Sequence, residues 1–336
     1  MRDEHTVGPA RSGCRSARSL HSGALALATA GALLLAGCSS SSGDSSNSSS
    51  SGSEAATSTG TAAGSKSLTP NAALIASIKP APKLVQLRGA SNATIVYGSS
   101  LVAPPDAFLA PDGKTAVGWE IDLINAIGRK MGSTMQARNL QFPTLITSLT
   151  AGRIKLIISE MSDSKERQKQ LNFVDYYTAS LSFLVAKGNP KHITTPAGLC
   201  GKNVAVLPGS SQLYWAQGAN SGLCGSHPMK LVQFSAGPTQ ALNSVRTGRV
   251  DVYLSENDLS GYTAEHTSGL QNVTLAHSPL SGVTGIGVPK SDRNLLNAVQ
   301  QALQQLLDDG TYTKIISAWQ AQSGAITKAT VNGATS

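Results

Sequence analysis

Residues 145–160 read LITSLTAGRIKLIISE, and their pattern returns in residues 241–256, which read ALNSVRTGRVDVYLSE. Each stretch combines helix-spaced apolar residues, a Gly-Arg pair, an apolar strand and a final Ser-Glu, and Gly152 corresponds to Gly248. The separation of 96 residues is too long for a solenoid repeat. The chain is therefore expected to contain two similar α/β lobes, although a Gly-Arg pair before a strand also arises by chance in α/β proteins.

The segments around the repeat alternate in the same way between short apolar strands and helical patterns. Residues 93–100, ATIVYGSS, predict a strand, and residues 118–132, GWEIDLINAIGRKMG, predict an amphipathic helix that ends at Gly132. Such alternation indicates a parallel α/β sheet, in which ligands bind beyond the carboxyl ends of the strands. Because both copies of the repeat end there in Ser-Glu, we expect Glu160 and Glu256 to face each other across a cleft.

The polar stretch SEMSDSKER, which follows the first copy of the repeat, indicates a site for a small anion. Ser159 and Ser162 lie at the strand end, where their hydroxyls can donate to a ligand, and Arg167 stands at the start of a short helical segment. Arginine holds a carboxylate with two parallel hydrogen bonds. These residues predict a pocket for a carboxylate, and the alternative is that Arg167 is a solvated helix residue.

The N-terminal 37 residues have the features of a secretory signal. Four arginines precede an apolar core at residues 24–36, which is shorter than the ~20 residues of a membrane span. The ending LAGC resembles the lipobox of bacterial lipoproteins, so Cys38 is expected to carry a lipid; an ordinary signal peptide with a chance cysteine is the alternative. Residues 39–67 are mostly Ser, Gly, Thr and Ala, which predicts a flexible tether within the segment 38–88.

Charge and cysteine content narrow the functional class. Without the signal segment the formal charge falls from +8 to +6, and no run of five basic residues occurs. A nucleic-acid binder would show a clustered basic stripe, so no nucleic-acid partner is expected. Cys200 and Cys224 are the only cysteines of the globular part; in an exported domain they predict a disulfide, with two free thiols as the alternative.

Five stretches, in this order, resemble the family 3 extracellular solute-binding proteins, the amino-acid receptors of ABC importers. They are VGWEIDLINAIGRKMG, LITSLTAGRIKLIISEMSDSKERQKQLNFVDYYTASLSFLVAKGNP, KNVAVLPGSS, ALNSVRTGRVDVYLSEND and LLNAVQQALQQLLDDGTYTKIISAWQ, spread over residues 93–322. The resemblance implies a two-lobed α/β fold of the type II periplasmic-binding-protein kind, with a ligand cleft between lobes joined by two crossover strands. It places lobe 1 at residues 89–187 and 281–325, lobe 2 at residues 188–280 and a C-terminal tail at residues 326–336.

The same resemblance implies ligand-binding roles for individual residues. Arg167 is expected to hold the α-carboxylate of an amino acid, and Glu256 is expected to hold its α-ammonium group. The other pocket residues that the family pattern implies are Phe142 beside the ligand side chain, Ser159, Glu160 and Ser162 in lobe 1, and Leu207, Ser210 and Ser211 in lobe 2.

The chain departs from the family pattern in the side-chain half of the pocket. Ser100 and Asp106 stand where many members have an acid and an aromatic residue, and Ala103 replaces a stacking aromatic residue. Glu160 occupies a position that is often Gly or Ser. Two neighbouring carboxylates repel unless a cation or a proton separates them. With Glu256 matched by an α-ammonium group, Glu160 favours a ligand with a second positive charge, such as a basic amino acid; the alternative is that Glu160 turns outward.

Together these features predict a monomeric, lipid-anchored receptor at the extracytoplasmic face of a bacterial cell membrane. It would bind a small polar amino acid by lobe closure and deliver it to an ABC-type permease. No enzyme activity, cofactor or metal is expected, because the sequence has no Ser-His-Asp order, metal-ligand spacing or glycine-rich phosphate loop. Two alternatives are an enzyme of the cyclohexadienyl-dehydratase type, with Glu160 and Glu256 as an acid/base pair, and a ligand sensor without transport.

Overall fold

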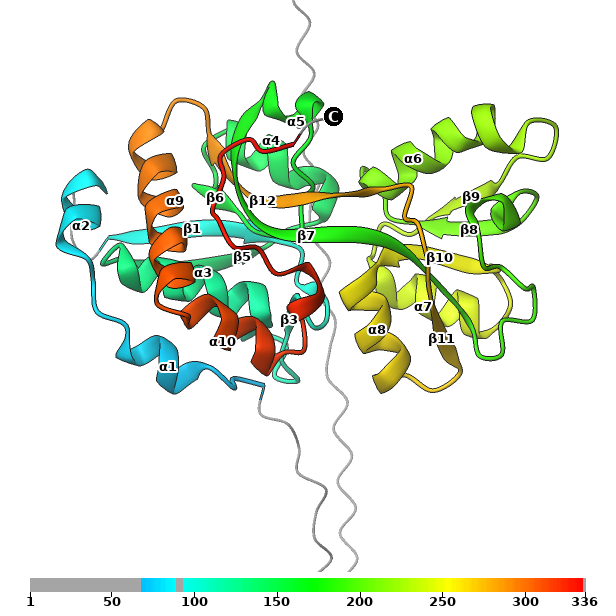
Figure 1. The fold of residues 1–336 in the computed structure, drawn as a ribbon, viewed down its shortest axis with the longest axis horizontal. Coiled ribbons are helices and arrows are strands. Elements are labelled where there is room, and N and C mark those ends of the chain that lie inside the picture. The colour runs from blue at the N-terminus through cyan, green and yellow to red at the C-terminus, as the bar shows by residue number, and fades with distance from the viewer. Residues whose placement is uncertain (1–67, 89–92, 335–336) are drawn as a thin grey trace, which may run out of the picture. The chain divides into compact units, whose positions relative to one another are not determined.

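The computed structural model describes residues 68–88 and 93–334, so the expectations for the signal segment, Cys38 and the serine-rich tether fall outside the described residues. Within them the chain forms two lobes (Figure 1). Lobe 1 contains α1 (Ala72–Ser77), α2 (Pro82–Arg88), β1 (Thr94–Ser99), β2 (Val102–Ala103), β3 (Ala107–Leu109), β4 (Ala116–Val117), α3 (Trp119–Lys130), β5 (Thr134–Asn139), η1 (Phe142–Thr144), α4 (Leu145–Thr150), β6 (Leu156–Ile157), α5 (Lys165–Gln168), β12 (Ser281–Pro289), α9 (Arg293–Asp308), α10 (Thr311–Ala318) and η4 (Gln322–Gly324). Lobe 2 contains η2 (Pro196–Leu199), β8 (Asn203–Val206), α6 (Ser211–Ala219), η3 (Asn220–Cys224), β9 (Lys230–Gln233), α7 (Pro238–Arg246), β10 (Val252–Glu256), α8 (Asn257–His266) and β11 (Leu270–Thr274), and the long strand β7 (Leu171–Ala186) belongs to both lobes.

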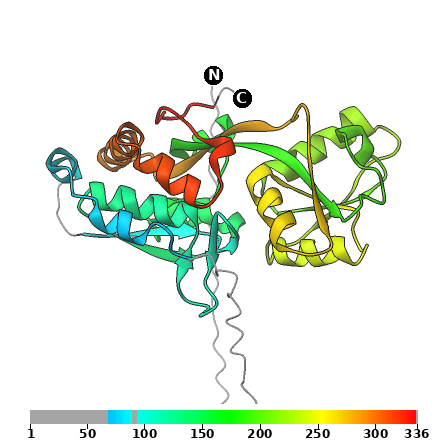
Figure 2. The same ribbon diagram turned by 60° about the horizontal axis from the view of Figure 1, so that its bottom comes forward.

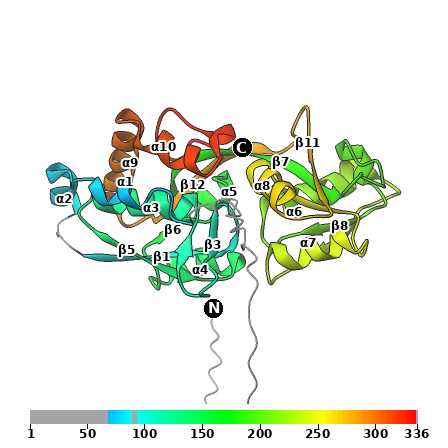
Figure 3. The same ribbon diagram turned by 90° about the horizontal axis from the view of Figure 1, so that it is seen from below.

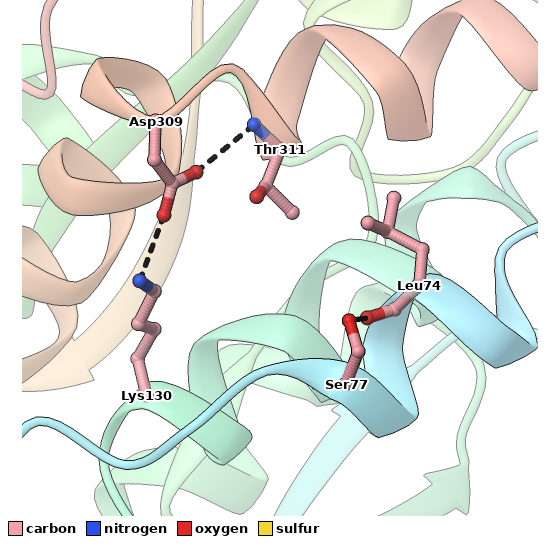
Figure 4. Close-up of polar contacts among 5 residues, drawn as sticks. All are labelled: Leu74, Ser77, Lys130, Asp309 and Thr311. Atoms are coloured by element: carbon pink, nitrogen blue, oxygen red, sulfur yellow. Dashed lines mark hydrogen bonds and ion pairs between the residues drawn. The ribbon is translucent and has the colours of Figure 1, made fainter.

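Lobe 1 is built on the strand order β5-β1-β6-β12-β7, in which β1 runs parallel to β5 and β6. Its largest core cluster joins that sheet to α3, α9 and α10, and Figure 3 shows α9 and α10 on one side of the sheet and α4 on the other. α3 is amphipathic and buries Leu123, Ile124 and Ile127 completely. Lys130 at its end pairs with Asp309, with an Nζ to Oδ2 distance of 2.8 Å, and this pair ties α3 to the end of α9 (Figure 4).

Lobe 2 repeats the same architecture on a smaller scale. β8 runs parallel to β9 and β10, and β10 and β11 pair with β7 in antiparallel orientation. A disulfide joins Cys200 to Cys224, with Cα atoms 5.2 Å apart, and it lies against the apolar cluster that contains Leu213 and Val204. This bond holds the loop after η2 against η3.

Two strands connect the lobes, and Figures 1 and 2 show β7 and β12 passing from one lobe to the other. β7 pairs with β12 as far as Ser180 and with β10 from Leu181 onward. The change of partner therefore comes before residue 187, where the sequence placed the end of lobe 1. Lys187 already belongs to lobe 2, because its N–H donates to the carbonyl of Gly269.

The internal repeat predicted from the sequence has the same local structure in both lobes. A glycine with a φ of 70° lies two residues after the end of each of α4 and α7, Gly152 and Gly248, and a parallel strand comes next in both lobes. The N–H of Arg153 donates to the carbonyl of Ser148 over 2.9 Å, and Arg249 repeats this bond in lobe 2 over 2.9 Å. A left-handed glycine lets the chain turn sharply from helix to strand. The two-lobed α/β fold expected from this repeat is confirmed.

The chain after η4 packs along lobe 1. Val331 forms a bridge with Val174 of β7, and the carboxylate of Asp175 accepts hydrogen bonds from the Thr330 hydroxyl and the Gly333 N–H. The segment expected as a tail therefore contributes contacts to lobe 1. Among the described residues, no helix combines the length and the apolar character needed to cross a membrane.

Candidate functional site

A pocket lies between the lobes, beyond the carboxyl ends of β1, β6, β8 and β10. Eight of the nine ligand-binding residues expected from the sequence line it: Phe142, Ser159, Glu160, Ser162, Leu207, Ser210, Ser211 and Glu256. The other lining residues are Ser100, Val102, Ala103, Asp106, Ala107, Glu120, Gln212, Pro238, Tyr253, Leu254 and Leu259.

Arg167, the ninth expected residue, lies beside the pocket and is 8% exposed. The Ser164 hydroxyl caps α5 by accepting the Arg167 N–H over 3.3 Å. The guanidinium donates from Nη1 to the carbonyl of Ser162 over 2.8 Å and from Nη2 to the carbonyl of Gly209 over 3.0 Å, and these two acceptors belong to opposite lobes. Its Cζ also lies 5.8 Å from the ring centre of Phe142.

The charge of Arg167 has no counter-ion within the described residues, since no carboxylate of theirs forms an ion pair with it. Burial lowers the pKa of Arg167, but an arginine stays protonated in proteins. A buried cation that is bonded only to neutral carbonyls is suited to receive an anion from outside the fold. This side of the pocket can therefore accept an anion.

Serine residues from both lobes line the pocket. The Ser211 hydroxyl donates to the Oγ of Ser162 over 3.0 Å, so this bond crosses the cleft. The Oγ of Ser159 accepts the backbone N–H of Ser100 over 3.0 Å. The Ser210 hydroxyl is engaged in capping α6, where it accepts a backbone N–H. Ser210 therefore lines the pocket while its hydroxyl stabilises the helix.

Glu256 ends β10 in extended conformation, directly before α8. Its Oε1 accepts a hydrogen bond from the Nε2 of Gln212, a residue of α6 that sequence reasoning did not single out. Burial and the charge of Asp258 raise the pKa of Glu256 to about 7, while the Gln212 hydrogen bond lowers it. A carboxylate in this setting gains from a nearby ammonium group, which would replace the lost hydration.

Glu160 has a φ of 45°, in the left-handed region that L-residues other than glycine rarely adopt. Its N–H donates to the Oε1 of Glu120 over 2.6 Å and to the Tyr176 hydroxyl over 3.1 Å. The side chain points inward, because its Oε1 is fully buried, and the outward orientation considered from the sequence is not the one observed. The buried carboxyl group of Glu160 lies close to those of Asp106 in lobe 1 and Asp258 in lobe 2.

Asp106, Glu160 and Asp258, called the acid cluster below, each contribute one carboxylate oxygen to a group within 4.8 Å of one another. Burial and neighbouring negative charges raise the pKa values of Asp106 and Glu160 well above their usual range, and burial also raises the pKa of Asp258. Burial raises the pKa of Glu120 to about 7. Oxygen donors of this kind suit hard metal ions or organic cations. The acid cluster can therefore accept a cation.

Sequence reasoning placed the binding serines, Phe142 and Glu256 at one pocket, but it missed two carboxylates that matter. Asp258 follows Glu256 by two residues in SEND, and helical spacing at the start of α8 was a signal that could have found it. Glu120 was interpreted only as part of an amphipathic helix, although it is an acid at a position that is 0% exposed. Asp106, noted only as a departure from the pattern, is 1% exposed. Its Oδ1 accepts the Trp119 indole N–H over 2.8 Å, and its Oδ2 has no hydrogen-bond donor.

Comparison with known proteins gives a consistent result. A sequence profile of the bacterial extracellular solute-binding proteins, family 3, matches residues 95–322. The arginine-binding protein ArgT of Corynebacterium glutamicum is 26% identical over 246 residues, which covers 72% of this chain and 79% of ArgT. The L-cystine-binding protein TcyJ of Escherichia coli is 27% identical over 231 residues, or 67% of this chain and 82% of TcyJ.

Solved structures agree with the sequence matches. An ancestral arginine-binding protein bound to glutamine superimposes with a TM-score of 0.62 at 29% identity, covering 68% of this chain and 98% of that protein. An ancestral amino-acid-binding protein described as a precursor of cyclohexadienyl dehydratase gives a TM-score of 0.60 at 26% identity, covering 70% of this chain and 98% of that protein. The neighbours are two-lobed amino-acid-binding proteins, as the fold described above requires.

Proposed function

The chain belongs to family 3 of the bacterial extracellular solute-binding proteins, and we propose that it is a receptor that binds an amino acid between its lobes and delivers it to an ABC-type permease. The preferred ligand has a cationic side chain. Lobe closure is the binding step, because residues of both lobes line the pocket.

The observation that carries this proposal is the presence of a buried arginine without a counter-ion in the same cleft as several carboxylates. Arg167 and Glu256, called the clamp below, supply the charges that an α-carboxylate and an α-ammonium group require. Burial lowers the pKa of Arg167, and the nearby groups that act against this effect do not belong to the acid cluster. The positive and negative parts of the pocket therefore act as separate sites for the two ends of a zwitterion.

The preference for a cationic side chain rests on the number of carboxyl groups in the cleft compared with the number of positive groups on the ligand. One α-ammonium group matches Glu256, and the acid cluster and Glu120 remain as further acids. A lysine-like or arginine-like side chain supplies a positive charge to them, whereas a glutamate side chain would add a further negative charge. Names of several relatives, such as the lysine/arginine/ornithine-binding protein of Escherichia coli, which is 30% identical over 230 residues, support the same class of ligand.

The receptor would act at the outer face of the cell membrane, held by a lipid on Cys38 and the serine-rich tether. This part of the proposal rests on the sequence alone, namely the LAGC ending after an apolar segment. Replacement of Cys38 by serine should release the exported protein from the membrane fraction into the medium or the periplasm. Persistence in the membrane fraction would contradict the anchor.

Ligand binding can be tested by thermal denaturation of the exported protein with each of the proteinogenic amino acids, ornithine and citrulline. A ligand at 100 times its dissociation constant adds about 2.7 kcal/mol to the free energy of unfolding. Basic amino acids should give the largest increase in melting temperature. If no amino acid raises the melting temperature, the proposed function is wrong.

An enzymatic role is the second candidate, because Glu256 is a pocket carboxyl with a pKa raised to about 7, as a general acid would need. The neighbour described as a precursor of a dehydratase makes this test worthwhile. Incubation with prephenate and arogenate, followed by mass spectrometry, would detect water loss and decarboxylation. We expect no turnover.

A further inference from the structure

The acid cluster has more negative charge than its surroundings can balance. Asp106 follows β2 and Glu160 follows β6 in lobe 1, whereas Asp258 lies in the first turn of α8 in lobe 2. No Lys, Arg or His occurs among the described residues that line the pocket. Three ionised carboxylates this close would repel strongly, so the closed cleft needs a positive charge between them.

A second observation points to a ligand at this place. Asp106 and Glu120 are 1% and 0% exposed, and each has one carboxylate oxygen, Oδ2 and Oε2 respectively, without a hydrogen-bond donor. Both side chains line the pocket beside Glu160, whose Oε1 is likewise without a donor. Buried acceptors are rarely left without a partner, because each one loses its hydration. These oxygens are positioned to accept hydrogen bonds from a cation that enters the pocket.

We propose that Asp106, Glu160 and Asp258 form a cation site shared by both lobes, which holds a proton in the empty closed cleft and exchanges it for the side-chain cation of the bound amino acid. The inference rests on the proposed function and adds the exchange to it. The step is a simple proton transfer: a carboxyl group loses its proton to water, and an ammonium or guanidinium group takes its place. The charge of the pocket is unchanged by the exchange.

The surroundings of Glu160 favour it as the group that holds the proton. The ionisable groups that face it are Asp106, Glu120 from α3, Glu256 from β10, Asp258 from α8, and the hydroxyls of Tyr176 and Tyr177 from β7 and Tyr253 from β10. All of these are acids, and none is a base. Its two partners in the acid cluster, Asp106 and Asp258, belong to different lobes, so a proton on Glu160 lies between carboxylates of both lobes.

The arrangement links closure of the cleft to occupation of the site. Because Asp258 lies in lobe 2 and its two partners lie in lobe 1, ionisation of all three carboxyls pushes the lobes apart. A basic amino acid restores the missing charge and permits closure at neutral pH. An amino acid with a neutral side chain closes the cleft only while the proton stays in place.

The test uses L-arginine and L-citrulline, which differ little in shape but differ in side-chain charge. Calorimetric titration of the exported wild-type protein at pH 7, in two buffers with different ionisation enthalpies, gives the number of protons released. We expect release of close to one proton with arginine and close to none with citrulline. Arginine affinity should also rise by up to tenfold per pH unit between pH 5 and pH 7, while citrulline affinity should not rise.

Two variants complete the experiment. Glu160→Gln should abolish the difference in proton release between the two ligands, and Glu166→Gln, at an exposed position of α5, should leave that difference unchanged. Equal proton release with arginine and citrulline in the wild type would overturn the inference. So would strong binding of Ca²⁺ alone that Glu160→Gln removes, since the resident cation would then be a metal ion.

Two results distinguish a failure of the proton exchange from a failure of the proposed function. Binding of neutral or acidic amino acids, with no binding of arginine, lysine or ornithine, would overturn the exchange and leave an amino-acid receptor. Failure of every amino acid to bind would overturn both.

Discussion

The two strand ends that carry Ser159-Glu160 and Ser255-Glu256 have the same sequence pattern and the same preceding structure, but they use their glutamates differently. In lobe 1 the chain turns into the left-handed region at Glu160, and the N–H of this residue is held by Glu120 and Tyr176. In lobe 2 the chain stays extended at Glu256 and enters α8 directly, and the carbonyl of Glu256 accepts the Ser182 hydroxyl.

This difference shows that a sequence repeat predicts the backbone position of a residue but not the direction of its side chain. Helix, left-handed glycine and parallel strand place both glutamates at the carboxyl edge of their sheets. The direction of each side chain then depends on the next few residues and on the neighbouring elements. Glu256 accepts a hydrogen bond from Gln212, and we propose that it binds the α-ammonium group, whereas Glu160 points into the acid cluster.

The largest effect is expected from the positive end of the clamp. Arg167→Ala should weaken binding of a basic amino acid by about 2–5 kcal/mol, because it leaves the ligand carboxylate desolvated and unpaired. Calorimetry measures the loss, and Lys169→Ala, an exposed neighbour just after the same helix, is the matched control. Binding by the Arg167 variant within threefold of wild type would rule out its role.

A difference in stability between the lobes should follow from their covalent structure. Only lobe 2 contains a disulfide among the described residues, and it closes a loop with a sequence separation of 24. Replacing Cys200 and Cys224 by serine should lower the free energy of unfolding by about 3 kcal/mol on the loop-entropy model. Urea denaturation followed by hydrogen exchange would locate the loss in lobe 2, and equal loss of protection in lobe 1 would contradict this view of the lobes.

The burial of Glu120 should make lobe 1 sensitive to pH. The pKa of Glu120 is raised to about 7 in the folded chain, against about 4.3 in unfolded chains. Since the folded state binds the proton more tightly, the stabilisation is complete below the unfolded pKa and is lost as the pH rises through about 7. The wild type should lose up to about 3 kcal/mol relative to Glu120→Gln between pH 4 and pH 8. Urea denaturation at both pH values measures this, and parallel pH profiles of the two proteins would be the contrary result.

The two glutamates can be compared directly by the same substitution. Glu256→Gln should weaken arginine and citrulline alike by about 2 kcal/mol, because both ligands carry the α-ammonium group. Glu160→Gln should reduce mainly the preference for arginine over citrulline. Calorimetry gives the dissociation constants of the two variants for the two ligands. If both substitutions change the affinities in the same way, the two glutamates do not have different roles.

The smallest effect tests the shared part of the repeat. Gly152 and Gly248 have the same φ of 70°, and a Cβ atom at either position would meet no heavy atom within 4 Å. Alanine at either position should therefore cost about 1 kcal/mol through backbone conformation alone. Chemical denaturation should give similar values for Gly152→Ala and Gly248→Ala, and a large inequality would indicate that the two turns are not equivalent.

Much of the fold was predictable because it depends on local patterns. The helix spacing of α3, the glycines after α4 and α7, and the apolar strands all follow from short stretches of sequence. The acid cluster was not predictable in the same way. Its members lie at positions 106, 160 and 258, and only the pairing of β7 with both β12 and β10 brings the two lobes together around them. The change of pairing partner after Ser180 is equally hard to predict, since β7 runs without interruption through both lobes.

The most direct test of the account is a calorimetric comparison of L-arginine with agmatine, the same molecule without its α-carboxylate, on the exported wild-type protein. If Arg167 binds the carboxylate and the carboxylates of the cleft bind the cationic groups, agmatine should bind about 100-fold more weakly than arginine, which corresponds to about 2.8 kcal/mol. Equal affinity for the two compounds would show that the acids alone recognise the ligand, and would contradict the account of an amino-acid clamp.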